Sequence, residues 1–154
     1  MGGALGAKLS KGGNDVTLVD VSRESVETIH KRGLTVEDQA GRLETIAIRA
    51  STDPASVRDA DLAMVVVKCY HTQAAVESIV PYLNANATVL SLQNGWGNAP
   101  RIAAVVGEER VMAGVTYHSA TVLGPGHVKH SGRGMTWIGE MDGRMSPRLE
   151  RVAT

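Results

Sequence analysis

The stretch that decides the fold is DADLAMVVVKCYHTQAAVESIVPYL, residues 59–83. Leu62 to Val67 form a continuous apolar run, which is typical of a parallel strand that is covered on both faces. The segment 71–83 that follows is predicted as a helix, and Pro81 should disturb this helix near its end. A buried strand followed at once by a helix is the repeating unit of an α/β protein.

The same order of strand and helix occurs on both sides of this stretch. DVTLVD, residues 15–20, is predicted as a buried strand, and residues 21–33 are predicted as a helix with Ser22 at its N-cap. ATVLSLQ, residues 87–93, is predicted as the next strand, and it is followed by the loop NGWGN and the helix APRIAAVVG. This alternation indicates an α/β fold with a doubly wound, mostly parallel sheet.

Two regions depart from the alternation. LTVED and LETIAIRAS, on either side of QAGR, are predicted as two short strands of a hairpin inserted into the fold. Residues 110–140 are predicted to contain three strands around the turns LGPG and SGRG. These strands, near the C-terminal end of the chain, would add an antiparallel patch to the sheet.

The two ends of the chain lead us to expect that a strand before residue 1 and a domain after residue 154 are absent from it. GGALGAKLSKGG, residues 2–13, is predicted as a helix, and we expect that the first strand, which should precede it, is absent. SPRLERVAT, residues 146–154, has Ser146 as an N-cap and Pro147 at the first helical position, which is the start of a helix. We therefore expect an N-terminally truncated domain at residues 1–145 and a helix that leads to a domain outside this chain.

Composition and charge exclude several classes of function. The chain carries 16 basic and 16 acidic side chains, so its formal net charge is zero, whereas a general nucleic-acid or anionic-membrane binder needs a net basic surface. The single cysteine, Cys69, excludes an internal disulfide and a multi-cysteine zinc site, and it fits a reducing cytoplasm. No apolar run reaches the length of a membrane span and no signal peptide is visible, so we expect a cytoplasmic protein.

Glycines at the start of the first predicted helix and an aspartate after the next strand favour a dinucleotide site. MGG, residues 1–3, matches the tail of a G-x-G-x-x-G turn, where exposed N–H groups contact a pyrophosphate. Alternatively, Gly2, Gly3 and Gly6 only allow close helix packing. Asp20 lies about 18 residues after Gly2, where nicotinamide-binding folds place an acid that accepts hydrogen bonds from the adenosine ribose; otherwise it is a turn or N-cap aspartate.

Other chemistry-bearing side chains give weaker signals. Cys69 could serve as a nucleophile and His71 as its base, as far as residue type goes. Side chains this close in sequence at a strand end point in different directions, however, which disfavours such a pair. The histidines His118, His127 and His130 have no cysteine or carboxylate at metal-ligand spacing. We therefore interpret them as strand histidines at a solvent edge and expect no metal site.

Together, these segments resemble a known family. The N-terminal domain of ketopantoate reductase, also called 2-dehydropantoate 2-reductase, is similar in the strings LVD, VVVKCYHTQAAVESIVPYL, LSLQNGWGN, RVMAGVTYHSATVLGPGHVKHSG and TWIGE. The resemblance covers about residues 1–140. It implies a Rossmann-like doubly wound sheet, here without its first strand, in an oxidoreductase of pantothenate biosynthesis. Such an enzyme reduces a 2-oxo acid, 2-dehydropantoate or a similar one, to a D-2-hydroxy acid with a hydride from NAD(P)H.

The resemblance also implies cofactor-binding roles for particular positions. Met1 and Gly2 match the last two places of the glycine-rich turn. Lys68 resembles a family lysine that approaches the cofactor, and a cation at a strand's carboxyl end can pair with phosphate or ribose oxygens. Alternatively, the lysine only marks the point where a buried strand reaches the solvent-exposed surface. Ala120 resembles a family position whose backbone borders the cofactor.

Asn94, in QNGWGN, resembles the family asparagine that binds both the cofactor and the substrate. Its amide donates and accepts at once, which suits a polar ligand. Asn-Gly is also the commonest turn dipeptide, and both interpretations hold together because Gly95 and Gly97 leave room for a ligand. Trp96 in the same loop either forms a wall for the nicotinamide or the substrate, or only covers the loop.

The residue after Asp20 bears on the choice of cofactor. NADP-using members of the family typically carry an arginine where this chain has Val21, and the carboxylate of Asp20 would repel a 2′-phosphate. The pair favours NAD, as in relatives similar to D-mandelate dehydrogenase. Arg23 lies close by in the sequence and keeps NADP open.

The resemblance places the catalytic lysine and its assisting glutamate in a second, helical domain. The catalytic residues are therefore unknown in this chain, and we expect the chain alone to be inactive. A non-catalytic nucleotide-binding module and an inactive fragment are the alternative interpretations. The expected partner is a small-molecule 2-oxo acid, with no nucleic acid and no membrane, and a homodimer is left open.

Overall fold

The computed structural model describes residues 1–153, which form two compact units. Unit 1 comprises Met1–Ser56 and Tyr117–Gly134. Unit 2 comprises Val57–Thr116 and the residues from Met135 onward. Each unit has its own buried apolar cluster.

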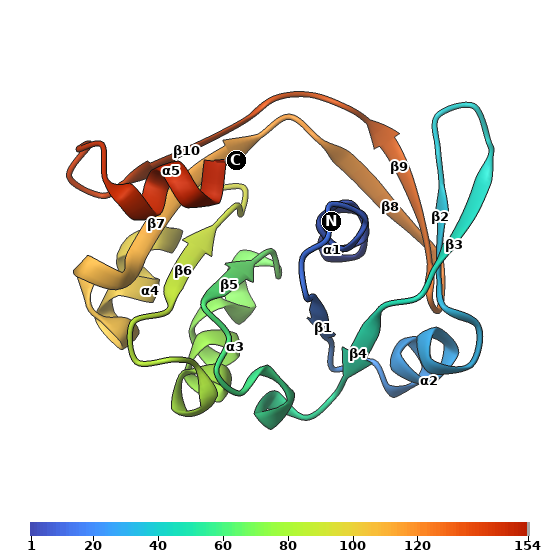
Figure 1. The fold of residues 1–154 in the computed structure, drawn as a ribbon, viewed down its shortest axis with the longest axis horizontal. Helices are drawn as coiled ribbons and strands as arrows, with labels where there is room; N and C mark the ends of the chain where they lie inside the picture. The colour runs from blue at the N-terminus through green and yellow to red at the C-terminus, as the bar shows by residue number, and fades with distance from the viewer. Residues whose placement is uncertain (154) are drawn as a thin grey trace. The chain divides into compact units, whose positions relative to one another are not determined.

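Unit 2 contains a four-stranded sheet in the order β10-β7-β6-β5 (Figure 1). The parallel strands are β5 (Leu62–Val65), β6 (Thr88–Ser91) and β7 (Val111–Thr116), and β10 (Thr136–Glu140) pairs antiparallel with β7. Val65 lies opposite Ser91 in the register of β5 and β6. The carboxyl ends of these two neighbouring strands therefore meet at the same edge of the sheet.

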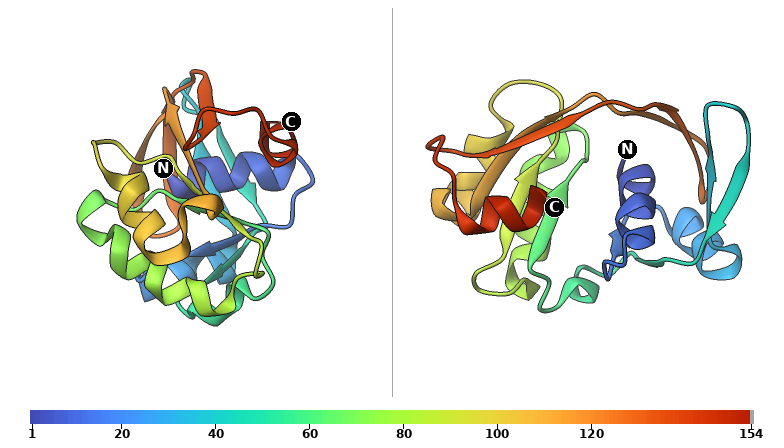
Figure 2. Two further views of the ribbon diagram at one scale, coloured as in Figure 1. Left: turned by 90° about the vertical axis from the view of Figure 1, so that its left-hand side faces the viewer. Right: turned by 45° about the horizontal axis from the view of Figure 1, so that its top comes forward.

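Helices connect the parallel strands of unit 2. The connections contain α3 (Thr72–Ile79) after β5 and α4 (Asn98–Val106) after β6, and α5 (Pro147–Ala153) follows β10. α3 contacts α4, while α5 contacts β10 (Figure 2). α3 ends at Ile79 and a 3₁₀ turn covers Val80–Tyr82, as expected for Pro81, which has no N–H and clashes with the preceding helical turn. The predicted alternation of strand and helix is confirmed.

The strand that is covered on both faces is β6, which corrects the expectation for residues 62–67. All four residues of β6 are buried, whereas the first three residues of β5 are only half-buried. β5 is the edge strand of its sheet and ends at Val65. The carbonyl of Val67 accepts a hydrogen bond from a side chain instead of a neighbouring strand, so the apolar run is longer than the strand.

Unit 1 contains two sheets. One sheet is the parallel pair of β1 (Thr17–Val19) and β4 (Arg49–Ser51); the other has the order β3-β2-β9-β8, with β2 (Leu34–Glu37), β3 (Leu43–Ile46), β8 (Ser119–Gly124) and β9 (His127–Gly132). The helices of this unit are α1 (Gly2–Lys11) and α2 (Arg23–Arg32). α1 contacts β1, β2 and β9. The α/β class with parallel sheets and an antiparallel patch is confirmed, but the strands occupy three sheets rather than one.

Two details of the predicted strands need correction, and one strand pairing was not predicted. LETIAIRAS breaks into β3, which forms the predicted hairpin with β2, and β4, which pairs in parallel with β1. The region 110–140 contains four strands instead of three. β2 also pairs in parallel with β9. Pairing between segments this far apart in the chain leaves no local pattern in the sequence.

Close packing in unit 1 explains two glycines of α1. A Cβ atom at Gly6 would lie 2.6 Å from Cδ2 of Leu18, and one at Gly3 would lie 3.3 Å from Cγ1 of Val128. Ala4 and Ala7, on the same helix, are buried. The interpretation that Gly3 and Gly6 allow close helix packing is therefore confirmed, and it is compatible with a ligand at the start of the helix.

Candidate functional site

Lys68 and Asn94 follow the carboxyl ends of two adjacent parallel strands in unit 2. Lys68 lies between β5 and the 3₁₀ turn Cys69–His71, and Asn94 lies between β6 and α4. Both residues are exposed. The crevice outside the carboxyl ends of parallel strands is where α/β proteins bind their ligands, so the structure places these two predicted residues suitably for a ligand.

Gln93 links the two loops that carry Lys68 and Asn94. Its Nε2 donates to the carbonyl oxygen of Val67 and to Oγ1 of Thr72, both at 2.8 Å. Thr72 is fully buried at the start of α3. Sequence reasoning gave no separate role to Gln93, because the neighbouring Asn-Gly pair carried the resemblance and Val67 and Thr72 lie more than twenty residues away.

A glycine loop presents Asn94 and Trp96. Gly95 and Gly97 have φ angles of 97° and 82°, a left-handed conformation that favours glycine. The buried Asn98 donates from Nδ2 to the carbonyl oxygens of Asn94 at 3.0 Å and Gly95 at 3.3 Å. Trp96 is 100% exposed, so it does not cover the loop and remains a candidate wall for a ligand.

The start of α1 in unit 1 contains Met1 and Gly2. The first helical hydrogen bond runs from the N–H of Leu5 to the carbonyl of Met1, at 3.1 Å, so the N–H groups of Gly2, Gly3 and Ala4 point out of the start of the helix. The first turn contains no acidic residue, and Lys8 and Lys11 lie in the last turn. The positive end of the helix dipole is therefore not neutralised by a carboxylate of its own helix and can attract an anion.

Asp20 lies directly after β1 and is exposed. Its Oδ1 accepts a hydrogen bond from the N–H of Ser22 at 2.9 Å, and its N–H donates to the carbonyl of Ser51 at 3.1 Å. Ser22 caps α2 by accepting from the N–H of Ser25. The turn interpretation of Asp20 is therefore correct, and it leaves Oδ2 accessible to a ligand. Val21 is 97% exposed.

Ala120 lies in β8 of unit 1, where it pairs with His130 next to an irregularity in the register. Its side chain is half-buried and packs against the core of the unit. Met1, Gly2, Asp20 and Ala120 thus belong to unit 1, whereas Lys68 and Asn94 belong to unit 2.

The expectation that His118, His127 and His130 lie at a solvent edge is wrong for His130. His130 is only 5% exposed, and its Nε2 lies 2.9 Å from Nδ1 of His118. Burial lowers the pKa of both His118 and His130, and the positive charges of Lys8 and Arg133 lower these pKa values further. The described residues contain no cluster of three or more metal-ligating side chains, and these charges oppose a bound cation.

Cys69 is exposed. The neighbouring His71 ring packs edge-on against Tyr70, with ring centroids 4.4 Å apart.

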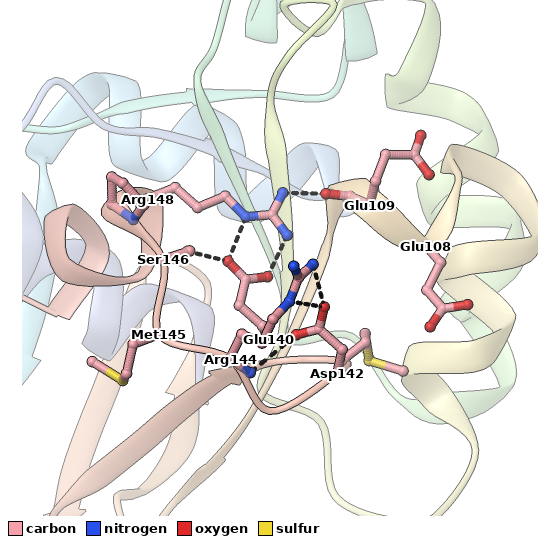
Figure 3. A pocket seen from close by; sticks show the side chains of 10 residues that line it. Glu108, Glu109, Glu140, Asp142, Arg144, Met145, Ser146 and Arg148 are labelled. Atoms are coloured by element: carbon pink, nitrogen blue, oxygen red, sulfur yellow. Dashed lines mark hydrogen bonds and ion pairs between the residues drawn. The ribbon is translucent and has the colours of Figure 1, made fainter.

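A pocket of about 650 Å³ in unit 2 is lined by none of the predicted site residues, and Figure 3 shows the side chains that line it. Arg148 of α5 pairs through both Nε and Nη2 with the carboxylate of Glu140, and Ser146 donates to the same carboxylate. Arg148 also donates to the carbonyl of Glu109. These bonds hold the pKa of Glu140 below its ordinary value. Because the charged groups of Arg148 and Glu140 pair with each other, we interpret their interaction as a structural one that holds α5 in place.

Comparison with known proteins identifies the family. Residues 1–143 match the family "Ketopantoate reductase PanE/ApbA". The chain belongs to this family. It is 37% identical over 153 residues to the 2-dehydropantoate 2-reductase of Halobacterium salinarum, a match that covers 99% of this chain and 50% of that protein. The chain thus spans about half the length of the ketopantoate reductase relatives it matches.

Solved structures of similar proteins share the fold. The 2-dehydropantoate 2-reductase of Geobacter metallireducens GS-15 matches with a TM-score of 0.84 and 31% identity, over 98% of this chain and 48% of that one. D-mandelate dehydrogenase, solved with NADH and anilino(oxo)acetate, matches with a TM-score of 0.84 and 25% identity, over 97% of this chain and 47% of that one. Between residues 1 and 153, no helix combines the length and the apolar character that crossing a bilayer requires.

Proposed function

We propose that this chain is the cofactor-binding part of a ketopantoate reductase-like oxidoreductase that uses NADH to reduce a 2-oxo acid to a D-2-hydroxy acid. The match to the family over residues 1–143 is the observation that carries this proposal. Residues 1–145 form the cofactor-binding part in this proposal. The helix that starts at residue 147 leads to a second domain, which supplies the proton donor for the substrate oxygen.

In unit 2, Lys68 is the candidate residue for binding the cofactor, and Asn94 is the candidate for binding both the cofactor and the substrate. The exposed ammonium group of Lys68 can pair with phosphate or ribose oxygens. Asn94 has an amide that both donates and accepts, which suits a ribose hydroxyl or a substrate carbonyl without adding charge. The bound cofactor supplies a hydride to the carbonyl carbon, and the role of these two side chains is to orient the reacting groups.

Asp20 is the candidate that selects NADH over NADPH. Oδ1 already holds the N–H of Ser22, and the exposed carboxylate can also accept hydrogen bonds from the two adenosine ribose hydroxyls. A 2′-phosphate at the same place would meet a negative charge, and Val21 offers it no cation. The complex of D-mandelate dehydrogenase with NADH supports this choice of cofactor. Met1, Gly2 and Ala120 complete the proposed cofactor contacts through their backbones.

The alternative function is a nucleotide-binding module without chemistry. In this alternative the chain binds the dinucleotide, but no proton donor acts on a bound 2-oxo acid. The two functions differ in a turnover assay of the protein that contains the second domain. In both cases we expect the 154-residue chain to bind NADH without reducing 2-oxo acids.

Calorimetric titration of the chain with NADH and with NADPH tests the proposal. We expect tighter binding of NADH. Asp20→Asn keeps an oxygen for the N–H of Ser22 but removes the charge, so it should weaken NADH binding by about 1–3 kcal/mol, the value of a hydrogen bond to a charged group. Glu24→Gln, at an exposed acid in the first turn of α2, is the matched control and should leave the affinity unchanged. Equal or tighter binding of NADPH by the unaltered chain would contradict the assignment.

A further inference from the structure

Gln93 is a polar side chain at the proposed cofactor site that the proposed function leaves without a role. It directly precedes Asn94, and it bonds to Val67, which directly precedes Lys68. It also bonds to Thr72 at the start of α3. One side chain thereby connects the segment after β5 with the segment after β6.

The orientation of the Gln93 amide follows from its partners. The carbonyl oxygen of Val67 only accepts hydrogen bonds, so the NH₂ end of the amide must face it. The second N–H of that NH₂ group reaches Oγ1 of Thr72, whose own proton goes to the carbonyl of Cys69 at 2.8 Å. Oε1 of Gln93 accepts from Oγ of Ser91 at 3.3 Å. Both ends of the amide are therefore satisfied, and the reversed orientation would set two acceptors against each other.

We infer that Gln93 is a positioning residue that fixes Lys68 and Asn94 relative to each other for cofactor binding. This inference rests on the proposed function. Both side chains are exposed, and both lie on segments outside the regular strand ladder. The backbone bond from the N–H of Leu92 to the carbonyl of Val65, at 3.2 Å, ends the direct link between the strands. Beyond that point the Gln93 amide holds the two segments together, and a ligand that contacts both needs them in register.

Gln93→Met and Gln93→Glu test the inference on the full 154-residue chain. Methionine keeps the length of the side chain but removes both donors, and a glutamate carboxylate sets an acceptor against the Val67 carbonyl. We expect both variants to raise the NADH dissociation constant about tenfold, with Gln93→Glu at least as impaired as Gln93→Met. Gln73→Met, at an exposed glutamine of α3 that bonds only to Glu77 among the described residues, is the matched control and should bind NADH normally.

A double-mutant cycle separates positioning from a general loss of structure. If Gln93 acts through its neighbours, Gln93→Met should cost less than about twofold once Lys68→Ala and Asn94→Ala are both present. The same tenfold loss in both backgrounds would overturn the inference, because Gln93 would then act without Lys68 and Asn94.

Amide hydrogen exchange gives a readout that does not depend on the cofactor. Gln93→Met should accelerate exchange in residues 67–71 and 94–97 together, while the amides of β9 stay protected. Unchanged exchange in either segment would overturn the inference. If the unaltered chain binds neither NADH nor NADPH, the proposed function fails, and the exchange data alone decide whether Gln93 holds the two segments together.

Discussion

The two units reach their stability by different routes. The core of unit 2 contains Val89, Ile102 and Met112, which are completely shielded from solvent, and its parallel strands are joined by helices that are close in sequence. Unit 1 contains two strands of only three residues and a core that includes Ala4 and Ala7. Its larger sheet joins segments as distant as Glu37 and Lys129, which are 92 residues apart. Local pattern therefore specifies unit 2, whereas pairing between distant segments specifies unit 1.

The largest effect on stability is expected from core substitutions, each of which should destabilise one unit more than the other. Ile102→Ala removes a fully buried side chain of unit 2 and should lower its free energy of unfolding by about 2–5 kcal/mol. Leu34→Ala is the matched change in unit 1, where Leu34 is 2% exposed. Hydrogen exchange should show the greater loss of protection in the unit that carries each substitution. Equal losses in both units after each substitution would contradict the division into two units.

A smaller difference in stability between the units should appear when the pH is lowered. The folded pKa values of His118 and His130 lie below the ordinary value of 6.5, so the unfolded chain takes up protons first. Unit 1 should therefore lose stability as the pH falls from 6.5 toward the folded pKa values. In unit 2 the pKa of Glu140 lies below its ordinary value of 4.5. Stability from this carboxylate is present above pH 4.5 and is lost as the pH falls through the folded pKa.

Amide exchange measured unit by unit against pH checks this order. Unit 1 should lose protection first, and unit 2 only in stronger acid. Glu140→Gln removes the charge that Arg148 pairs with, so it should lower the stability of unit 2 at neutral pH by about 1–3 kcal/mol and flatten its acid dependence. Loss of protection in unit 2 before unit 1 would contradict the assignment of these groups.

The same contrast explains what the sequence predicts and what it does not. Ser22 and Pro81 act on adjacent residues, so the start of α2 and the end of α3 are predictable. The buried pair of His118 and His130 depends on the β8–β9 register, which no local pattern shows. Sequence reasoning gave Gln93 no role for a similar reason, because its partners Val67 and Thr72 lie more than twenty residues away in the chain. Lys68 and Asn94 stay predictions, which rest on their resemblance to family positions and on their place in the segments after β5 and β6.

The most direct test of the central claim is the NMR spectrum of the ¹⁵N-labelled chain during titration with NADH. The account predicts that the largest shifts occur at Lys68, at the side-chain amide of Asn94, and at the backbone of residues 20–22. The pocket that Glu140 and Arg148 line should stay unchanged and serves as an internal control. Shifts that are largest at that pocket and absent at Lys68 and Asn94 would contradict the claim that these residues form the cofactor site.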